Sequence, residues 1–232
     1  MLLINGFNKT TLLDYPGHLA ATIFLGGCNF RCPFCHNASL VLSAEIQPII
    51  SKDEIFATLK KRVGILEGVC ITGGEPTLYA GLYDFIKQIK DLGFLVKLDT
   101  NGSNPHIISK LLEDKLIDYL AMDIKNSKEK YATTTGIKNI NTDKISESIS
   151  LLLNSNIDYE FRTTAVKNFH ENSDFLSIGQ WINNANAYYI QAFEDSGDLI
   201  SDGLSGFSLS ELKQFKEVVS PFVKYIDIRG VD

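Results

Sequence analysis

The chain of 232 residues is long enough to bury one sizeable hydrophobic core, and its composition, 44% hydrophobic and 22% charged, is that of an ordinary globular protein. No stretch approaches the roughly 18 apolar residues that a membrane span requires. The net charge of −6 argues against broad nucleic-acid binding, which needs a basic face. Residues 1–6 have neither the basic flank nor the apolar run of a signal peptide. We therefore expect a cytoplasmic protein that binds neither nucleic acid nor membranes.

In chain order, residues 2–20 contain two short extended pieces around Leu13-Asp14-Tyr15-Pro16-Gly17, and we expect them to cap an edge of a sheet. From there on, short β-rich runs alternate with helical patterns. The β-rich runs are continuously apolar, which is typical of parallel strands because both of their faces are buried. The predicted strands are 21–25, 69–71, 94–98, 119–124, 159–166, 187–193 and 225–228.

Helices are predicted between these strands. Two of them begin with a serine that is followed three residues later by a glutamate, which is the capping-box pattern. One is amphipathic and stops at a glycine, and two more carry apolar residues at helical spacing. The predicted helices begin after Ser51 and Ser208, or span 82–92, 143–153 and 173–182.

Alternating strands and helices predict parallel pairing with right-handed crossovers. About six strand–helix units are legible, fewer than the eight of a closed barrel, which needs about 250 residues. We therefore predict an α/β fold, an open partial (β/α)6 barrel with a short N-terminal extended cap, and keep a doubly wound sheet as the alternative. The chain is expected to form a single domain over 1–232, with its core at about 18–195 and a C-terminal extension at 196–232.

Three of the four cysteines, Cys28, Cys32 and Cys35, lie within eight residues in a C-x3-C-x2-C pattern. They can ligate three irons of a four-iron, four-sulfur cluster and leave the fourth iron open to a small molecule, whereas electron-transfer clusters usually take four cysteines. A zinc site completed by Cys70, His36 or another histidine is the main alternative, although zinc ligands more often come as separated pairs. Cys70 lies inside an apolar strand and is expected to be a small buried side chain.

Polar residues follow the predicted strands at their carboxyl ends, where α/β folds bind their ligands. Each motif alone has a structural alternative: Lys125 could be solvated, and Arg162 could form a surface ion pair with Glu160. Their presence at successive strand ends predicts one shared site. The motifs are Gly73-Gly74-Glu75-Pro76, Asp99-Thr100-Asn101-Gly102, Asp123-x-Lys125, Arg162-Thr163-Thr164 and Gln191.

The cysteine motif is followed by His36-Asn37, and the Gly-Gly-Glu-Pro, Asp-Thr-Asn-Gly and Asp-Ile-Lys motifs come after it in this order. By these motifs, residues 5–195 resemble the radical S-adenosylmethionine (SAM) superfamily. Within it, the chain is most similar to the glycyl-radical activating enzymes, in particular to those of anaerobic ribonucleoside-triphosphate reductase. The related pyruvate formate-lyase type carries a histidine after the sixth strand, where this chain has Gln191. This departure favours the reductase group.

The resemblance implies a [4Fe-4S] cluster on Cys28, Cys32 and Cys35, which cleaves SAM reductively so that the resulting radical takes hydrogen from a glycine of a partner enzyme. It also implies that Glu75 accepts hydrogen bonds from the SAM ammonium. At the matching positions of relatives, a monovalent cation can be held by two aspartates and a threonine. The implied SAM contacts are Phe34 and Asn37 at the adenine, Gly73, Gly74 and Glu75 at the methionine, Asp99 and Asp123 at the sulfonium, Lys125 and Arg162 at the ribose or carboxylate, Thr164 at the adenosine, and Gln191 in place of the histidine, with Asp99, Thr100 and Asp123 around the cation.

The expected partners are a glycyl-radical enzyme, with anaerobic ribonucleotide reductase favoured, and a flavodoxin- or ferredoxin-type electron donor. Turns at 195–198 and 201–203 predict a mobile loop near the open mouth, and 196–232 could dock the partner. Alternatives are activation of a pyruvate formate-lyase type enzyme, and a small-molecule enzyme such as 7-carboxy-7-deazaguanine synthase, which acts on a deazapurine precursor and is disfavoured by Cys-His-Asn. A non-enzymatic metal-binding protein is disfavoured by the polar strand ends.

Overall fold

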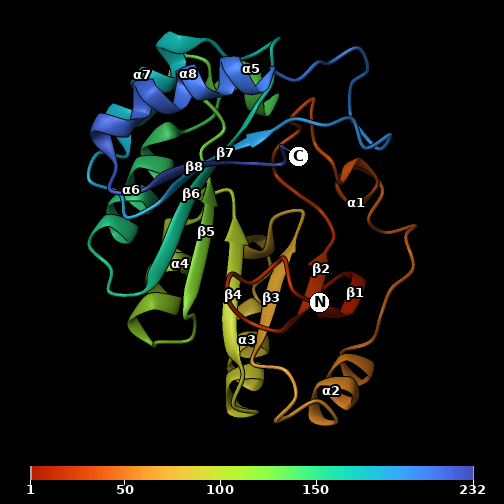
Figure 1. Cartoon of the computed structure of the whole chain (residues 1–232). Coiled ribbons are helices and arrows are strands. Elements are labelled where there is room, and N and C mark those ends of the chain that lie inside the picture. The colour runs from red at the N-terminus through yellow and green to blue at the C-terminus, as the bar shows by residue number, and fades with distance from the viewer. Residues whose placement is uncertain (1, 232) are drawn as a thin grey trace.

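The computed structural model describes residues 2–231, which contain an eight-stranded sheet with its strands in chain order. The first pair of strands is antiparallel, and every later pair is parallel. Within the described residues β1 and β8 form the two edges of the sheet, so the barrel stays open between them (Figure 1). The strands are β1 (Ile4–Thr11), β2 (Ala20–Leu25), β3 (Gly68–Gly73), β4 (Leu95–Thr100), β5 (Tyr119–Asp123), β6 (Asp158–Ala165), β7 (Tyr188–Ala192) and β8 (Ile226–Arg229).

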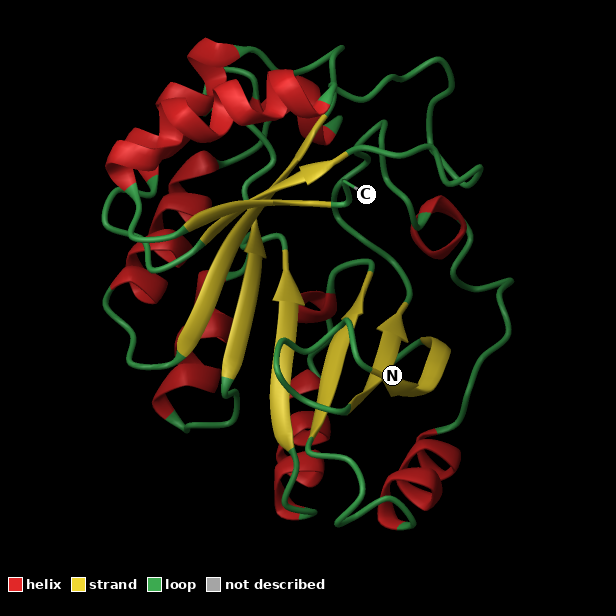
Figure 2. Cartoon of the chain, viewed as in Figure 1, coloured by secondary structure: helices red, strands yellow, loops and turns green. Residues whose placement is uncertain are grey.

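Helices cover the outside of the curved sheet (Figure 2). Their apolar residues face the strands, as in α3, where Leu82, Phe85, Ile86 and Ile89 are all buried. Burying such a stripe is what stabilises helices of this length. The helices are α1 (Ala38–Leu42), α2 (Lys52–Lys60), α3 (Leu82–Asp91), α4 (Pro105–Glu113), α5 (Tyr131–Thr135), α6 (Thr142–Leu153), α7 (Asn172–Trp181) and α8 (Leu209–Val219), with short 3₁₀ turns η1 (Pro76–Leu78) and η2 (Ser220–Phe222).

The predicted open α/β barrel is confirmed, and the seven predicted strands correspond to β2 through β8. The N-terminal segment differs from the prediction, because it contains one long strand, β1, instead of two short extended pieces. β1 ends at Thr11, whose hydroxyl accepts the backbone N–H groups of Leu13 and Asp14 and so starts a turn. The next strand after this turn is β2. β1 pairs with it in antiparallel orientation at the edge of the sheet, as expected of a cap.

The predicted helix ends are formed to different degrees. Ser208 and Glu211 form both halves of a capping box at α8. At α2 only one half forms, since the Ser51 side chain accepts from the Glu54 backbone. α3 ends before Gly93, which has the positive φ of +91° expected of a glycine that terminates a helix.

The C-terminal segment continues the same architecture. α8 packs on α7, and β8 pairs in parallel with β7, so residues after 196 extend both layers of the barrel. The turns at 195–198 and 201–203, which predicted a mobile loop, contact the loop that carries the cysteines. None of the helices in residues 2–231 has the length and the apolar character needed to cross a membrane.

Candidate functional site

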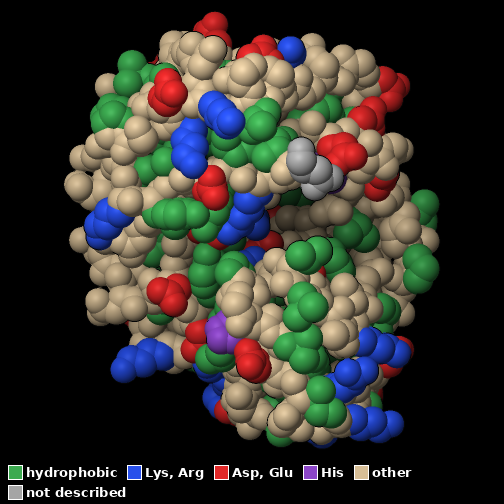
Figure 3. Space-filling model, viewed as in Figure 1, with side chains coloured by type: hydrophobic (Ala, Val, Ile, Leu, Met, Phe, Trp, Pro, Cys, Tyr) green, Lys and Arg blue, Asp and Glu red, His purple; other side chains and the backbone are tan. Residues whose placement is uncertain are grey.

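The three clustered cysteines lie in the loop that follows β2, at the carboxyl end of the sheet. Cys32 is buried, while Cys28 and Cys35 are partly exposed, and none of them forms a disulfide. All three line one cavity of about 270 Å³. Figure 3 shows the open side of the barrel hollowed near the middle of this face, with basic and acidic side chains along the hollow.

The cavity brings together every predicted site residue except Glu75. This follows from the topology, because parallel strands present their carboxyl ends at the same end of a barrel. The predicted residues that line the cavity are Cys28, Cys32, Phe34, Cys35, Asn37, Gly73, Gly74, Asp99, Thr100, Asp123, Lys125, Arg162, Thr164 and Gln191.

Gly73 and Gly74 allow the end of β3 to lie directly against the chain before the cysteines. A Cβ on Gly73 would stand 2.2 Å from the Leu25 carbonyl oxygen, and φ there is +120°. A Cβ on Gly74 would stand 1.9 Å from the Gly27 carbonyl oxygen. Both contacts involve backbone, which cannot rotate away, so only glycine fits. The two glycines therefore set the position of the cysteine loop as well as lining the cavity.

Glu75 is fully buried and lies outside the cavity wall. Its carboxylate accepts from the backbone and hydroxyl of Thr77, from the Thr100 hydroxyl at 2.8 Å and from the Asn101 backbone at 2.6 Å. Burial raises the pKa of Glu75, although these hydrogen bonds act in the opposite direction. In this structure Glu75 therefore joins the loops after β3 and β4, and its contact with a SAM ammonium stays a prediction.

Five charged side chains form an alternating row on the inner face of the barrel. Asp99 is bound by Lys97 and, at 3.3 Å, by Arg162. Arg162 also donates to Asp123 at 2.9 Å, and Asp123 accepts from Lys125 at 2.9 Å. Three cations thus alternate with two carboxylates. We call this set the charged row, residues 97, 99, 123, 125 and 162.

The charged row overturns both structural alternatives considered for its cations. Arg162 does not pair with Glu160, which is instead bound by Arg229 through two hydrogen bonds of 2.7 and 2.8 Å. Lys125 is held by Asp123 and is not merely solvated. Because Arg162 already bridges Asp99 and Asp123, these carboxylates are neutralised by protein cations. A monovalent cation at this place stays a prediction.

The pKa shifts in the charged row have consistent causes. Burial alone would raise the pKa of Asp123, but Arg162 and Lys125 outweigh it and lower the pKa to about 2. Burial acts in the same sense on Asp99, and Arg162 with Lys97 again lowers that pKa. Burial would lower the pKa of Lys125, and Asp123 raises it instead. All five groups are therefore charged at neutral pH, and the row carries a net charge of +1.

The rest of the cavity wall combines aromatic and amide side chains. Phe34 is buried and packs against Phe169, with 5.6 Å between ring centroids. The Asn37 amide donates to the Gly73 carbonyl at 3.2 Å. The Thr164 hydroxyl donates to the Gln191 side chain at 3.4 Å, so β6 and β7 meet at the mouth. These groups offer hydrogen-bonding atoms and an apolar surface to a bound nucleoside.

Five residues of the cavity wall were not among the predicted site residues. Asn101 lies with its amide nitrogen 3.8 Å from the Cys28 sulfur and donates to Asn29 at 2.9 Å. Thr72 donates to Asp99 at 3.1 Å. Asn101 belongs to the motif recognised after β4, and Thr72 directly precedes Gly73, so their position next to predicted residues was the available signal. Phe30, His36 and Val41 complete the wall.

The cysteines fit a polynuclear cluster better than a single ion. Among residues 2–231, no three His, Cys, Asp or Glu side chains converge closely enough to hold one metal ion. An iron–sulfur cluster instead spreads its thiolates over separate irons. Of the fourth ligands considered for zinc, Cys70 is buried within β3, as predicted, while His36 lines the cavity and stacks on Phe193. The preference for a cluster over zinc therefore rests on the spacing of the three cysteines and stays a prediction.

Burial opposes ionisation of two of the three thiols, Cys28 and Cys32. Burial raises the pKa of Cys28 to about 12, with a further increase from the Glu75 carboxylate. Burial likewise raises the pKa of Cys32 to about 11, while Lys125 acts in the opposite direction at both cysteines. A metal that binds these two thiols would have to displace their protons. The ammonium of Lys125 is placed to favour the thiolate form.

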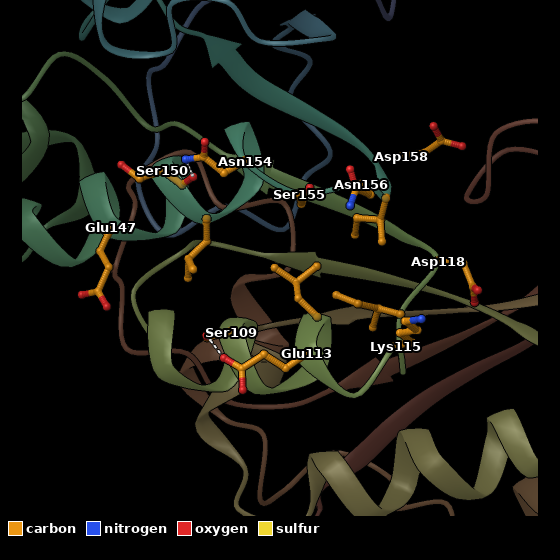
Figure 4. A pocket seen from close by; sticks show the side chains of 14 residues that line it. Ser109, Glu113, Lys115, Asp118, Glu147, Ser150, Asn154, Ser155, Asn156 and Asp158 are labelled. Carbon is orange, nitrogen blue, oxygen red and sulfur yellow. Dashed lines mark hydrogen bonds between the residues drawn. The ribbon is translucent and has the colours of Figure 1, made fainter.

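A larger cavity of about 840 Å³ lies on the outer surface between α4 and α6. It is bordered by the segments that lead into β5 and β6, hence at the amino ends of the strands. Figure 4 shows its polar rim, where Ser109 donates to Glu113 at 2.6 Å and Glu147 projects from α6. In barrel folds this end is generally structural. The chemistry of the chain therefore concentrates in the smaller cavity.

Comparison with known proteins agrees with this geometry. Residues 22–176 match the sequence profile of the radical SAM superfamily. The chain is 32% identical over 229 residues to a Methanocaldococcus jannaschii protein that is named, provisionally, a glycyl-radical enzyme activating enzyme; the match covers 97% of this chain and 93% of the relative.

Two solved structures share the fold. A domain of pyruvate-formate lyase-activating enzyme from Bacteroides vulgatus superposes with a TM-score of 0.57 and 15% identity, over 70% of this chain and 99% of that domain. SuiB of Streptococcus suis, solved with S-adenosylmethionine bound, gives a TM-score of 0.67 and 14% identity, over 88% of this chain and 48% of its own. At these identities the likeness concerns the fold.

Proposed function

This chain belongs to the radical SAM superfamily, and we propose that it activates an anaerobic ribonucleotide reductase by generating a radical on a glycine of that partner. The observation that carries the activating-enzyme class is the end-to-end similarity to a glycyl-radical enzyme activating protein. Support for the reductase comes from Gln191, which lines the cavity at the position where the pyruvate formate-lyase type has a histidine.

Enzymes of this superfamily use a [4Fe-4S] cluster and SAM, and we propose that Cys28, Cys32 and Cys35 hold the cluster here. When bound and reduced, the cluster supplies the electron that cleaves the sulfonium of SAM to methionine and a deoxyadenosyl radical. The protein's own contribution is orientation, because a misplaced radical would take hydrogen from the wrong group. The buried position of Cys32 and the close backbone contacts at Gly73 and Gly74 support a rigid loop for this purpose.

The charged row is suited to binding SAM. Its net charge of +1 complements the SAM carboxylate, and we assign Lys125 and Arg162 to the carboxylate or ribose. Asp99 and Asp123 remain ionised and can face the sulfonium. We propose that Glu75 accepts hydrogen bonds from the SAM ammonium, with Thr100, whose hydroxyl donates to its carboxylate, holding it in place. Phe34, Asn37, Thr164 and Gln191 are assigned to the adenosine.

A protein substrate is supported by the open barrel. The sheet has free edges at β1 and β8, so a loop of another protein can approach the cavity from the side. A glycine is a suitable target, since its α-radical is stabilised by the flanking amides and no side chain blocks the approach. We propose a flavodoxin- or ferredoxin-type protein as electron donor. A cytoplasmic location is part of the proposal, because free thiols that bind iron require a reducing compartment.

The experiment uses anaerobically reconstituted protein, reduced with dithionite and mixed with SAM and one candidate partner at a time. A glycyl signal in electron paramagnetic resonance with an anaerobic reductase, and none with a pyruvate formate-lyase, is the expected result. The partner with its radical glycine changed to alanine and the Cys32→Ser activating protein serve as controls, and both should abolish the signal. A glycyl signal with pyruvate formate-lyase alone would move the assignment to that class. Deoxyadenosine release without a glycyl signal from any partner would contradict a protein substrate.

A further inference from the structure

The loop that connects β7 to α8 lies at the carboxyl end of the barrel. It leaves the end of β7 and reaches the cysteine loop after β2, so it joins strands near opposite edges of the sheet (Figure 1). We call residues 193–206 the strap. At its base, the Lys167 backbone donates to the Ser205 carbonyl at 3.0 Å, and Gly206 packs against the Phe193 carbonyl. The strap is therefore a closed loop that is anchored to the turn after β6.

The tip of the strap binds the first turn of α1. The Asp198 carboxylate accepts from the Ser39 hydroxyl at 2.8 Å and from the Ser39 backbone at 3.3 Å. The Asp198 carbonyl accepts from the Ala38 backbone at 3.5 Å. These are N–H groups that a helix cannot satisfy internally. A carboxylate is the favoured partner at this end of a helix, because the helix dipole is positive there.

α1 depends on this contact because its own sequence does not cap it. Asn37 occupies the N-cap position, yet it makes no capping hydrogen bond, and its side chain donates to Gly73 instead. A helix of five residues is too short to persist without tertiary support. Asp198, 159 residues further along the chain than Ser39, supplies the cap from the strap.

α1 and the strap in turn hold the cysteine loop. The Gly27 backbone, directly before Cys28, donates to the Leu40 carbonyl of α1 at 2.7 Å. Between the second and third cysteines, the Pro33 carbonyl accepts from the Ser201 backbone at 2.9 Å. The loop is thus fixed at both ends of the motif by elements that the strap positions. The His36 ring, directly after Cys35, stacks on Phe193 at the start of the strap.

We propose that Asp198 is a positioning residue for the iron–sulfur cluster, which caps α1 from the strap and so holds the cysteine loop in its ligating conformation. The cluster it acts on is that of the superfamily, so the proposal does not depend on which glycyl-radical protein is the partner. Its test uses the cluster itself and no partner protein.

The test compares Asp198→Ala with Asp202→Ala, a matched control that removes an exposed carboxylate of the same strap. Iron and sulfide content are measured after anaerobic reconstitution, followed by the rate of iron release to a chelator from folded holoprotein. We expect at least threefold faster release from Asp198→Ala, an intermediate rate from Asp198→Asn, whose amide oxygen can still accept from Ser39, and an unchanged rate from Asp202→Ala. Circular dichroism of the apoproteins checks that each variant is folded.

Ser39→Ala removes the partner hydroxyl and tests the same contact from the helix side. It should also accelerate iron release, and adding Ser39→Ala to Asp198→Ala should cause little further change because both act on one interaction. Equal release rates for Asp198→Ala and Asp202→Ala would overturn the proposal. A lower unfolding midpoint of the Asp198→Ala apoprotein with unchanged iron release at a temperature far below that midpoint would also overturn it, since that pattern indicates a merely structural role.

Discussion

Within the charged row, Arg162 is the cation that contacts both carboxylates, Asp99 and Asp123. A lysine, which is a single point charge, could not make both contacts in the same way. The Arg162 guanidinium reaches Asp123 through Nε and Asp99 through Nη1, which requires a planar group with several donors. Removing one partner of a buried ion pair costs about 3–5 kcal/mol. Lys97 and Lys125 remain, so we expect Arg162→Met to lower the free energy of unfolding by about 2–3 kcal/mol, measured by denaturant titration, and to weaken SAM binding.

The matched control is Arg62→Met, which removes an exposed guanidinium that contacts only Thr10 among its described hydrogen bonds. Such surface changes usually stay within about 0.5 kcal/mol. If the two variants had equal unfolding free energies and equal affinities for SAM, the charged row would not have the structural and binding role assigned to it.

Gly74 offers a second test at residue scale. Alanine at this position would place its Cβ against the Gly27 carbonyl, one residue before Cys28. Overpacking commonly costs about 1–3 kcal/mol, and here rigid backbone must move. We expect Gly74→Ala to lose at least about 2 kcal/mol of unfolding free energy and to bind less iron on reconstitution. Gly81→Ala is the control, because its Cβ would meet only Leu2 at 4.0 Å and its φ of −85° suits alanine. Similar iron content in the two variants would contradict the prediction.

Single residues also show what the sequence could and could not predict. The cavity residues were predictable because they follow strands, and strand ends meet at one end of a barrel. The hydrogen bonds that bury Glu75 were not predictable, because its donors come from two loops, at Thr77 and Asn101, whose proximity is not visible in a linear motif. The structural alternative of an ion pair between Arg162 and Glu160 fails for a similar reason. Arg162 is near Glu160 in sequence, but Arg229, 69 residues away, lies closer in space.

At the scale of elements, His170 joins the turn after β6 to the end of β5. Its Nε2 donates to the Lys125 carbonyl at 2.9 Å, so its Nδ1 accepts from the Val166 backbone at 3.2 Å. In this neutral form both ring nitrogens have backbone partners. Burial lowers the pKa of His170, although its backbone hydrogen bonds and Asp174 act to raise it; Lys130 lowers it further.

This shift predicts how stability depends on pH. The unfolded histidine binds a proton below a pKa of about 6.5, whereas the folded one resists protonation. Stability is therefore complete above that pH and falls as the pH drops from about 6.5 toward the folded pKa. We expect His170→Gln to lose this component of the pH dependence in denaturant titrations between about pH 5 and 7. His106→Gln, at an exposed position of α4, should keep it; loss in both variants would refute the role of His170.

The elements themselves were predicted where the physical signal was strong. β2 through β7 are largely apolar and buried, and α3, α6 and α7 bury apolar stripes. β1 was harder, because an edge strand with several exposed residues lacks such a run. α1 and α5 have five residues each, too few for a helical period to be detected. α1 in particular depends on Asp198, and no local pattern could have revealed that contact.

At the scale of the whole molecule, the last strand of the open barrel needs stabilising contacts beyond its strand pairing. β8 has four residues and pairs only with β7 within the described residues. Arg229 connects β8 to strands further inside the sheet. Its guanidinium binds both carboxylate oxygens of Glu160 on β6 and lies over the Tyr189 ring, 3.3 Å from the ring centroid. The Tyr119 hydroxyl on β5 donates to the same carboxylate at 2.7 Å. One ionic cluster thus connects four neighbouring strands.

We therefore expect Arg229→Met to make the C-terminal edge of the sheet, β8 with α8, unfold locally more often than the rest of the barrel. Glu160 would be left buried without its cation, which costs about 3–5 kcal/mol when a pair is fully buried; since Arg229 is about one-third exposed, a loss of about 1–3 kcal/mol is expected. Hydrogen exchange followed by mass spectrometry should show faster exchange in β8 and α8, with β2 through β5 unchanged. Uniformly faster exchange across the sheet would contradict a local fastening.

Combining Arg229→Met with Glu160→Met tests whether the Arg229–Glu160 ion pair itself raises or lowers the free energy of unfolding. The double variant removes both charges, so no buried carboxylate is left unpaired, and apolar side chains fill the space between β6 and β8. Its unfolding free energy should exceed that of Arg229→Met alone, because the penalty in the single variant comes from the uncompensated Glu160. Additive losses would instead mean that each side chain stabilises the edge independently, through its own packing. In that case the opening between β1 and β8, through which a partner loop is proposed to enter, would owe its shape to packing and not to this ion pair.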